Sequence, residues 1–311
     1  MDLLDYKGNN TIMSFQLQKA ERAQAKLRVG VNGPSGSGKT YSALLLAYGI
    51  TNDWSKIVVI DTENNSASLY AHLGEFNTLN LDAPYSPERY IEAIKACEDA
   101  GMEVIIIDST SHEWEGSGGC LQINEKLAAT KFRGNTWSAW SETTPRHQNF
   151  IHAITASKAH VITCTRNKID TVMTEDKKVK KVGTKEIQRE GFEYEITLNF
   201  NIDRDTHHAI VSKDRTNLFE SQDPFIITTE TGKQLVEWAQ SGKPVEQPAK
   251  VVHKSYTKSD VADLTRSLFP SITNEEIKNK IIELTNLDPS TEDPTVVYKA
   301  LAEVGPKVII D

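Results

Sequence analysis

Cysteine and long apolar runs are both scarce in this chain of 311 residues. The three cysteines, Cys97, Cys120 and Cys164, are scattered without C-x-x-C spacing, which argues against a disulfide framework or a zinc site. The longest aliphatic runs, such as residues 104–107, are far too short to cross a bilayer, and residues 1–10 lack the apolar core of a signal peptide. We therefore expect a cytoplasmic protein with reduced thiols and no membrane partner.

The chain also lacks an excess of positive charge. Its 35 basic and 43 acidic side chains give a net charge of -8, so no global positive field draws it to nucleic acid or to an anionic membrane. Any contact with nucleic acid must therefore be local. The length suffices for one substantial α/β domain and a smaller appendage.

One glycine-rich segment matches the phosphate-binding pattern G-x-x-x-x-G-K-[ST] at every fixed position. Strand-forming residues, 27–31, precede it, and helix-forming residues, 41–50, follow it. Glycine lets the backbone curl until successive N–H groups point at phosphate oxygens. A glycine-rich turn with a chance lysine is the alternative. The segment predicts a nucleotide site made by Gly33, Pro34, Ser35, Gly36, Ser37, Gly38, Lys39 and Thr40, with Tyr41 following them.

Two residues of this segment also have expected chemical roles. Lys39 should reach the β and γ phosphates and assist catalysis, and the Thr40 hydroxyl should ligate magnesium. Further along, four aliphatic residues, 104–107, lead to Asp108, which is typical of a buried strand that delivers a carboxylate to the active edge of a parallel sheet. In this Walker B pattern Asp108 would hold Mg²⁺ through water. ATP and Mg²⁺ are thus the predicted ligands.

A second carboxylate follows another apolar strand, predicted over residues 56–60. Glu63 comes just after this strand, where open α/β sheets bind their ligands. It is therefore a catalytic candidate that would orient or deprotonate the water attacking the γ phosphate. A solvated loop carboxylate is the alternative.

The segment after Asp108 is expected to be irregular. Residues 112–119 contain three glycines and predict a mobile loop, in which His112 has no partner at metal-ligand spacing. Helices are expected between residues 121 and 158, with interruptions near residues 133–137 and at Pro145. Trp137 and Trp140 either stack on single-stranded nucleic acid or are core residues one helical turn apart.

Residues 167–191 follow a strand predicted over 160–166, lose apolar periodicity and gather positive charge. In an acidic protein this local surplus is the best candidate for contact with a phosphate backbone. A solvated β-hairpin of mixed charge is the alternative. The predicted DNA-binding residues are Lys177, Lys178, Lys180, Lys181, Lys185 and Arg189.

Strand-like alternation over residues 194–202 and 208–212 ends in two cations, Lys213 and Arg215. Because they are two residues apart on extended chain, their side chains point to the same side and can reach one polyanion. Our hypothesis is that both act catalytically on the γ phosphate of an adjacent subunit, which requires a homo-oligomer. A charged turn in water is the alternative.

The remaining segments divide the chain. Residues 1–25 are polar and predict an N-terminal arm, and residues 26–241 form the core, which ends in a short helix. Residues 242–256 are rich in Pro, Gln, Lys and Val without periodicity, as expected of a linker. Residues 257–311 predict a small helical C-terminal domain without a catalytic signature.

With these motifs the chain resembles the RecA-like ATPases, and among them the phage-encoded ATP-binding proteins of the single-strand annealing and recombination group. The likeness covers roughly residues 26–242 and rests on the phosphate loop, on the Glu63 segment and on Ile107-Asp108-Ser109. Residues 111–116, 144–147 and 191–195 resemble the phage group in particular. It implies an α/β fold, a RecA-like P-loop NTPase core with a mostly parallel central sheet flanked by helices. It also implies a DNA-binding loop over about residues 169–189 and paired basic fingers at Lys213 and Arg215.

The resemblance also has one departure and several functional implications. Many family members carry Gln at the end of the strand that senses the γ phosphate, whereas this chain has Thr163, Cys164 and Thr165. The implied function is a DNA-stimulated ATPase that assembles on single-stranded DNA, as a ring or filament, in phage recombination or annealing within the host cytoplasm. A single-strand DNA-binding protein is a candidate partner. A hexameric helicase-type motor and a P-loop small-molecule kinase are the alternatives.

Overall fold

A computed structural model describes residues 22–173, 179–243 and 256–308 of the chain. The chain forms two compact units, Met1–Val245 and Glu246–Asp311. The division falls within the segment that the sequence predicts to be a linker. Residues 1–21 of the predicted N-terminal arm and residues 244–255 of the predicted linker lie outside the described residues.

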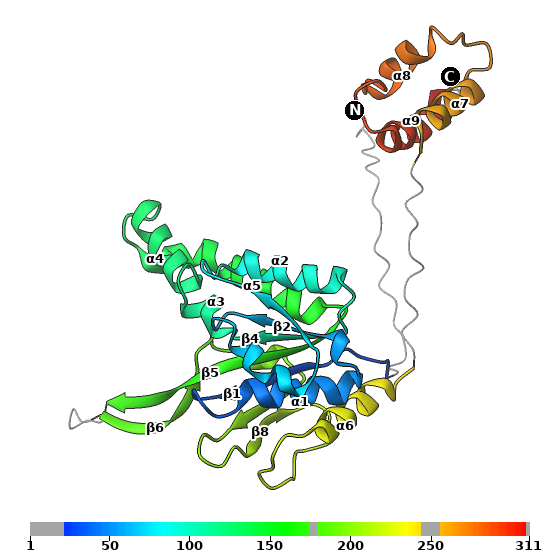
Figure 1. The fold of residues 1–311 in the computed structure, drawn as a ribbon. Coiled ribbons are helices and arrows are strands. Elements are labelled where there is room, and N and C mark those ends of the chain that lie inside the picture. Colours follow the sequence, from blue (N-terminus) through cyan, green and yellow to red (C-terminus); the bar gives the residue numbers. More distant parts are fainter. Residues whose placement is uncertain (1–21, 174–178, 244–255, 309–311) are drawn as a thin grey trace, which may run out of the picture. The chain divides into compact units, whose positions relative to one another are not determined.

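The larger unit is built on a mostly parallel sheet (Figure 1) with the strand order β3-β2-β4-β5-β1-β7-β8, to which β6 adds by pairing with β5. Strand β5 (His160–Met173) lies between β4 and β1 and is parallel to both. Among the strands of the described residues, only β6 and β8 are antiparallel to their neighbours. The other strands are β1 (Arg28–Gly33), β2 (Ile57–Asp61), β3 (Asn77–Asn80), β4 (Val104–Asp108), β6 (Val179–Glu186), β7 (Leu198–Ile202) and β8 (Ala209–Asp214).

Helices cover both faces of the sheet (Figure 1), and this explains why the central strands are apolar at successive positions. On one face, α1 (Lys39–Thr51) and α6 (Thr229–Gln240) pack against side chains such as Ile57 and Val59. On the other face, α2 (Pro87–Asp99) and α5 (Thr136–Ala156) pack against side chains such as Val58 and Ile60. The predicted α/β fold, with a mostly parallel sheet flanked by helices, is confirmed.

Helix α1, which follows the glycine-rich loop, is held in place by close backbone contact with α6. A Cβ atom on Gly49 would lie 2.0 Å from the carbonyl oxygen of Thr229, and one on Gly232 would lie 2.2 Å from that of Leu46. Larger residues at these two glycines would force the helices apart. The loop therefore starts from a fixed strand and ends on a fixed helix.

Two local expectations were wrong. Residues 112–119 are not all loop, because α3 (Ser111–Glu115) forms before the glycines, and α4 (Cys120–Thr130) begins directly after them. Helix α5 continues through Pro145 without interruption. Proline has no N–H, so one carbonyl group in the preceding turn lacks its helical hydrogen bond. Pro145 lies on the exposed face of this helix, where water can donate to that carbonyl. Packing along the rest of this long helix outweighs the local preference.

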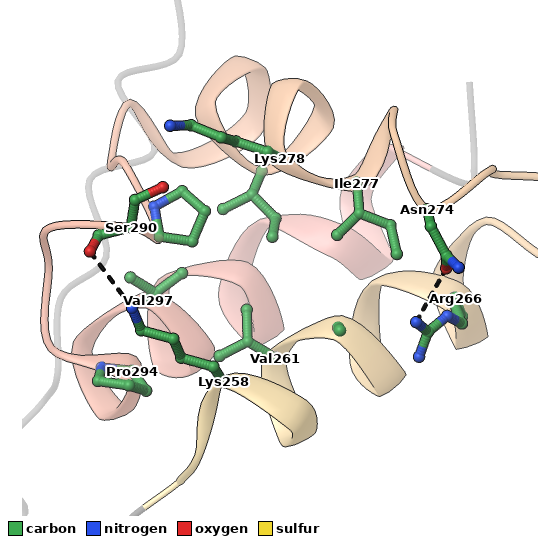
Figure 2. Close-up of a pocket in the computed structure, with 12 residues that line it drawn as sticks. Lys258, Val261, Arg266, Asn274, Ile277, Lys278, Ser290, Pro294 and Val297 are labelled. Carbon is green, nitrogen blue, oxygen red and sulfur yellow. Dashed lines mark hydrogen bonds between the residues drawn. The ribbon is translucent and has the colours of Figure 1, made fainter.

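The described part of the smaller unit contains α7 (Lys258–Leu268), α8 (Ile277–Thr285) and α9 (Pro294–Val308), with a small apolar core of their own. This unit contains a hollow of about 330 Å³, whose lining residues are drawn in Figure 2, and none of the predicted site residues lines it. Two of the cations that line this hollow already form hydrogen bonds: Lys258 donates to the Ser290 carbonyl, and Arg266 donates to Asn274. No helix in the described ranges is long and apolar enough to span a membrane.

Candidate functional site

The glycine-rich loop connects the carboxyl end of β1 to the amino end of α1. Gly36 and Gly38 adopt positive φ angles of 81° and 91°, a region that other residues rarely occupy. The loop thereby curls so that α1 begins at Lys39 with its free N–H groups facing the loop, an arrangement that binds anions. The Lys39 ammonium folds back over the loop and donates to the Pro34 carbonyl at 3.0 Å. His207, from the β7–β8 connection, lies with Nδ1 2.9 Å from the Ser37 carbonyl oxygen and supports the loop.

The side chains in this loop fit a phosphate group. Ser37 Oγ is buried and has no hydrogen-bond partner among the described residues, so a polar group remains unused within the loop. The space beside Gly36 is open, since no atom lies within 4 Å of the place that a Cβ would occupy. Tyr41, on the first turn of α1, is 41% exposed and close to Tyr70. The loop therefore offers both the donors and the room that a triphosphate requires.

The two residues expected to hold Mg²⁺ are in direct contact. The Thr40 hydroxyl donates to Asp108 Oδ2 at 2.5 Å, which joins the start of α1 to the end of β4. Burial raises the pKa of Asp108 to about 6, the nearby Glu63 charge adds to this effect, and the Thr40 hydroxyl and the Lys39 ammonium oppose it. A hydroxyl and a carboxylate are hard oxygen donors of the type that Mg²⁺ prefers. A bound cation would also favour the charged form of Asp108.

Asp61, the last residue of β2, and Glu63, two residues beyond it, make different contacts. Asp61 accepts backbone N–H bonds from Glu63 at 2.7 Å and from Ala67 at 2.8 Å, so its carboxylate shapes the turn. Glu63 instead extends to Arg166, whose Nε and Nη2 lie 2.8 Å and 2.7 Å from Glu63 Oε1. In the sheet register Asp61 pairs with Asp108, which places Glu63 at the same edge as the Thr40–Asp108 pair.

Arg166 lies at the end of the polar part of β5, next to Gly33 in the sheet register. The preceding side chains are buried: Thr163 donates to the Val29 carbonyl, and Thr165 contacts Thr110. Cys164 is fully buried between the neighbouring strands. Sequence reasoning considered these three as sensors of the γ phosphate, whereas Arg166 is the side chain of this segment that contacts Glu63.

Lys213 and Arg215 contact two neighbouring backbone carbonyls of their own chain, and their action on one phosphate stays a prediction. Lys213 Nζ donates to the Glu193 carbonyl at 2.6 Å, and Arg215 donates to the Tyr194 carbonyl at 2.8 Å. Strand β8 runs antiparallel to β7, and Asp214 pairs with Leu198, the first residue of β7. The two cations therefore lie at the sheet edge opposite the glycine-rich loop, about 16 Å away along five residues of extended strand. They cannot serve the loop of their own chain in this position.

Beyond Arg166, β5 leaves the central sheet and pairs with β6 to form a projecting hairpin (Figure 1). Of the predicted DNA-binding residues, Lys180 and Lys181 belong to β6, whereas Lys177 and Lys178 lie outside the described residues. At the base of the hairpin, Lys185 is exposed and lies 3.7 Å from Glu190. The predicted basic segment is thus largely an extended hairpin.

An exposed aromatic surface lies beside the base of this hairpin. Trp137 is 84% exposed, so the interpretation as a core residue is wrong for this tryptophan. Trp140 stacks on Trp114 with ring centroids 5.6 Å apart, and the Arg189 guanidinium lies 5.7 Å from the Trp140 ring centroid. These four side chains line a groove of about 950 Å³.

The base of the hairpin is also tied to the strand that carries Asp108, a link that sequence reasoning missed. Gln188 donates to the Thr110 carbonyl at 3.0 Å and to the Glu113 carboxylate at 3.4 Å. Thr110 in turn donates its backbone N–H to the Cys164 carbonyl at 3.0 Å. A continuous set of contacts therefore joins the hairpin to the end of β4.

Comparison with known proteins agrees with this geometry. A family model described as an AAA domain matches residues 25–225, which include the glycine-rich loop, both carboxylate-bearing strands and the hairpin. No curated protein matches the chain. Because the match covers most of the chain, the protein belongs to the AAA domain family and carries a nucleotide-binding domain of the P-loop ATPase type.

Proposed function

We propose that the protein is a DNA-stimulated, Mg²⁺-dependent ATPase that assembles on single-stranded DNA and acts in phage DNA recombination or annealing. The observation that carries this proposal is the course of β5. The strand starts in the sheet, passes Gly33 of the phosphate loop at Arg166 and continues into the lysine-rich hairpin. Nucleotide state and nucleic-acid contact are thus connected by one element.

Each residue of the nucleotide site has a defined task in this proposal. Lys39 stabilises the charge of the transferring phosphoryl group. Thr40 and Asp108 would hold Mg²⁺, which when bound neutralises charge on the phosphate oxygens. Glu63 orients the attacking water and accepts its proton, and Arg166 positions the Glu63 carboxylate.

The hairpin and the aromatic groove provide two complementary contacts with single-stranded DNA. Lysines on the hairpin neutralise backbone phosphates and release counterions. The exposed ring of Trp137 offers a stacking platform for a base, which does not depend strongly on sequence. Arg189, close to the Trp140 ring, adds a positive charge between the two surfaces.

The placement of Lys213 and Arg215 supports assembly. Because they lie at the sheet edge opposite their own phosphate loop, an adjacent subunit is the partner that would present a phosphate to them. Arginine suits this task, since its planar fork grips two oxygens and stays charged at any working pH. A homo-oligomer would then complete each site from two chains.

The test measures ATP hydrolysis with and without single-stranded DNA, together with the mass of the particles formed. Hydrolysis that rises with DNA, alongside larger particles, is the expected result. Turnover that ignores DNA would argue against the proposal and favour the kinase alternative. Displacement of a strand from a tailed duplex would instead favour the helicase-type motor, which shares the Lys-x-Arg finger.

A further inference from the structure

Three buried side chains outside the nucleotide site bring a carboxylate, a thiol and an imidazole together. Glu113, Cys120 and His147 come from α3, α4 and α5, and each is at most 4% exposed. Cys120 Sγ lies 3.0 Å from Glu113 Oε1, and His147 Nδ1 lies 3.0 Å from the same oxygen. The three donor atoms all lie within 4.8 Å of one another, and no other such group occurs within the described ranges.

The Glu113 carboxylate pairs with His147, which is charged only when protonated, and so lacks a partner with a permanent positive charge. In the described part of the chain, neither a lysine nor an arginine forms an ion pair with it. Among the described residues, its side-chain contacts are the Cys120 thiol, the His147 imidazole and the Gln188 amide, the last at a long 3.4 Å. A buried carboxylate is costly unless a positive charge or strong hydrogen bonds compensate it.

We propose that Glu113, Cys120 and His147 bind a divalent transition-metal ion of the zinc class. One sulfur, one nitrogen and one oxygen ligand form a set that zinc accepts, whereas Mg²⁺ and Ca²⁺ require oxygen ligands throughout. The ion would therefore not compete with Mg²⁺ at Thr40 and Asp108. The metal's charge balances the buried carboxylate and the thiolate together.

The spacing of the donor atoms is close to what such an ion needs. Around tetrahedral zinc, donor atoms lie about 3.4–3.6 Å apart, as follows from bonds of about 2.0–2.3 Å. The observed 3.0 Å separations require the side chains to open by about half an ångström around the ion. A water or the nearby Gln188 side chain would fill the fourth position.

Such an ion would join three helices that otherwise meet through side-chain packing. Helix α3 begins at Ser111, three residues after Asp108, so Glu113 follows closely on the end of the strand that carries the Walker B carboxylate. The ring centroids of Trp114 and His147 are 5.4 Å apart. One wall of the aromatic groove therefore packs against a ligand of the proposed ion. The ion is therefore structural. It would fix the position of the aromatic groove relative to the nucleotide site at Asp108.

Cobalt(II) gives a direct test on the full chain after chelator treatment and thiol reduction. A thiolate ligand gives tetrahedral Co²⁺ a charge-transfer absorption band that ions bound by oxygen alone lack. We expect this band in the wild type, its displacement by Zn²⁺ but not by Mg²⁺, and about one zinc ion per chain. Zn²⁺ should also raise the melting temperature of the wild type.

The diagnostic variant is Cys120→Ser, which keeps the size of the side chain and a hydroxyl that can donate to Glu113. It should lose the band and the zinc-dependent thermal shift. Cys97→Ser, at a buried thiol on α2, is the matched control and should keep both. Circular dichroism reports whether each variant folds. A folded, reduced wild type without the band, or a band that survives in Cys120→Ser, overturns the proposal.

Discussion

The guanidinium of Arg166 holds one oxygen of Glu63 through two nitrogens, Nε at 2.8 Å and Nη2 at 2.7 Å. The two residues come from the ends of separate strands, and Arg166 stands beside Gly33 of the phosphate loop. Arg166 therefore fixes where the Glu63 carboxylate points. Because Arg166 lies beside the phosphate loop, we expect a γ phosphate bound there to attract the same guanidinium and so to couple nucleotide binding to the position of Glu63.

Glu63→Gln should leave ATP binding nearly intact and slow hydrolysis by about 10²–10⁴, because the amide keeps the shape but cannot accept a proton. Arg166→Ala should slow hydrolysis by about 10²–10³ through loss of the positioning contact. Since the two residues act as a unit, the double variant should be less than about tenfold slower than Glu63→Gln alone. Single-turnover rates with matched nucleotide-binding measurements give all three values.

Arg89→Ala, which removes a half-buried arginine of α2 that donates to the Asp82 and Pro84 carbonyls, is the control for this comparison and should hydrolyse ATP normally. If the effects of Glu63→Gln and Arg166→Ala multiply fully in the double variant, the two side chains act independently and the contact has no catalytic meaning.

His160 should make the protein sensitive to acid. Its Nδ1 accepts the Leu27 N–H at 3.0 Å, and burial, with the Lys26 and Arg28 charges, lowers its pKa from 6.5 to about 3. Below about pH 6.5 the unfolded chain therefore binds a proton at His160, whereas the folded protein binds it only near pH 3. The stabilisation is complete above pH 6.5 and is lost as the pH falls, at roughly 1.4 kcal/mol per unit.

Urea unfolding at pH 7 and pH 5 measures this effect. His160→Asn keeps an acceptor for Leu27 without a titrating ring, so its free energy of unfolding should fall by about 2 kcal/mol less than that of the wild type. The exposed His152 provides a control, because His152→Asn should change the pH dependence little. If the free energy of unfolding falls equally from pH 7 to pH 5 in the wild type and in His160→Asn, the low pKa of His160 is wrong.

The hairpin lysines should determine how strongly salt weakens DNA binding. Changing Lys177, Lys178, Lys180 and Lys181 together to Ala removes up to four phosphate contacts. The slope of log affinity against log salt should then shrink by up to about 0.7 per lost contact for a single strand. Fluorescence anisotropy of a labelled oligonucleotide over a salt series gives the slope.

A matched control removes the same charge from exposed lysines elsewhere on the larger unit, at Lys95, Lys126, Lys158 and Lys233. It should alter the slope far less than the hairpin variant. An unchanged slope in the hairpin variant would assign the main contact to the groove around Trp137 and Trp140 instead.

Two inactive proteins should restore each other's activity when they are mixed. Lys39→Ala lacks a working phosphate loop and Arg215→Ala lacks the finger, yet a mixed assembly contains interfaces at which an intact loop meets an intact finger. A finger supplied by a neighbour is worth about 10³–10⁵ in rate, so activity should recover well above either protein alone. The wild-type specific activity should also rise with protein concentration. No recovery, with activity independent of concentration, would describe a self-contained ATPase.

The sequence predicts well what depends on local pattern. The glycine-rich loop, the Asp108 strand and the meeting of Thr40 with Asp108 all follow from motif spacing and from the rule that parallel strands end at one edge. The contact between Arg166 and Glu63 could not be predicted in this way, because it depends on side-chain reach across two strands. The cluster around Glu113 is equally hidden, since its members follow no metal-ligand motif and lie on three different helices.

Solvent exposure and helix continuity were also beyond local pattern. The spacing of Trp137 and Trp140 gives a helical turn but not the face that the helix buries, and the structure exposes Trp137. Helix α5 tolerates Pro145 because it is held on both sides of the proline: Thr143 donates to Asn124 of α4, and Phe150 lies in the core. Both outcomes are decided by packing of the whole unit.

The change of partner within β5 also sets which insertions and deletions the chain can tolerate. Arg166 is the last residue paired with β1 and Asn167 is the first paired with β6, so no loop separates the nucleotide edge from the hairpin. Residues added in pairs near the hairpin tip would lengthen it and leave the site untouched. One residue added between Arg166 and Asn167 would turn every later side chain of the strand to the opposite face. Natural variants of this protein should therefore differ in hairpin length far more readily than at this junction.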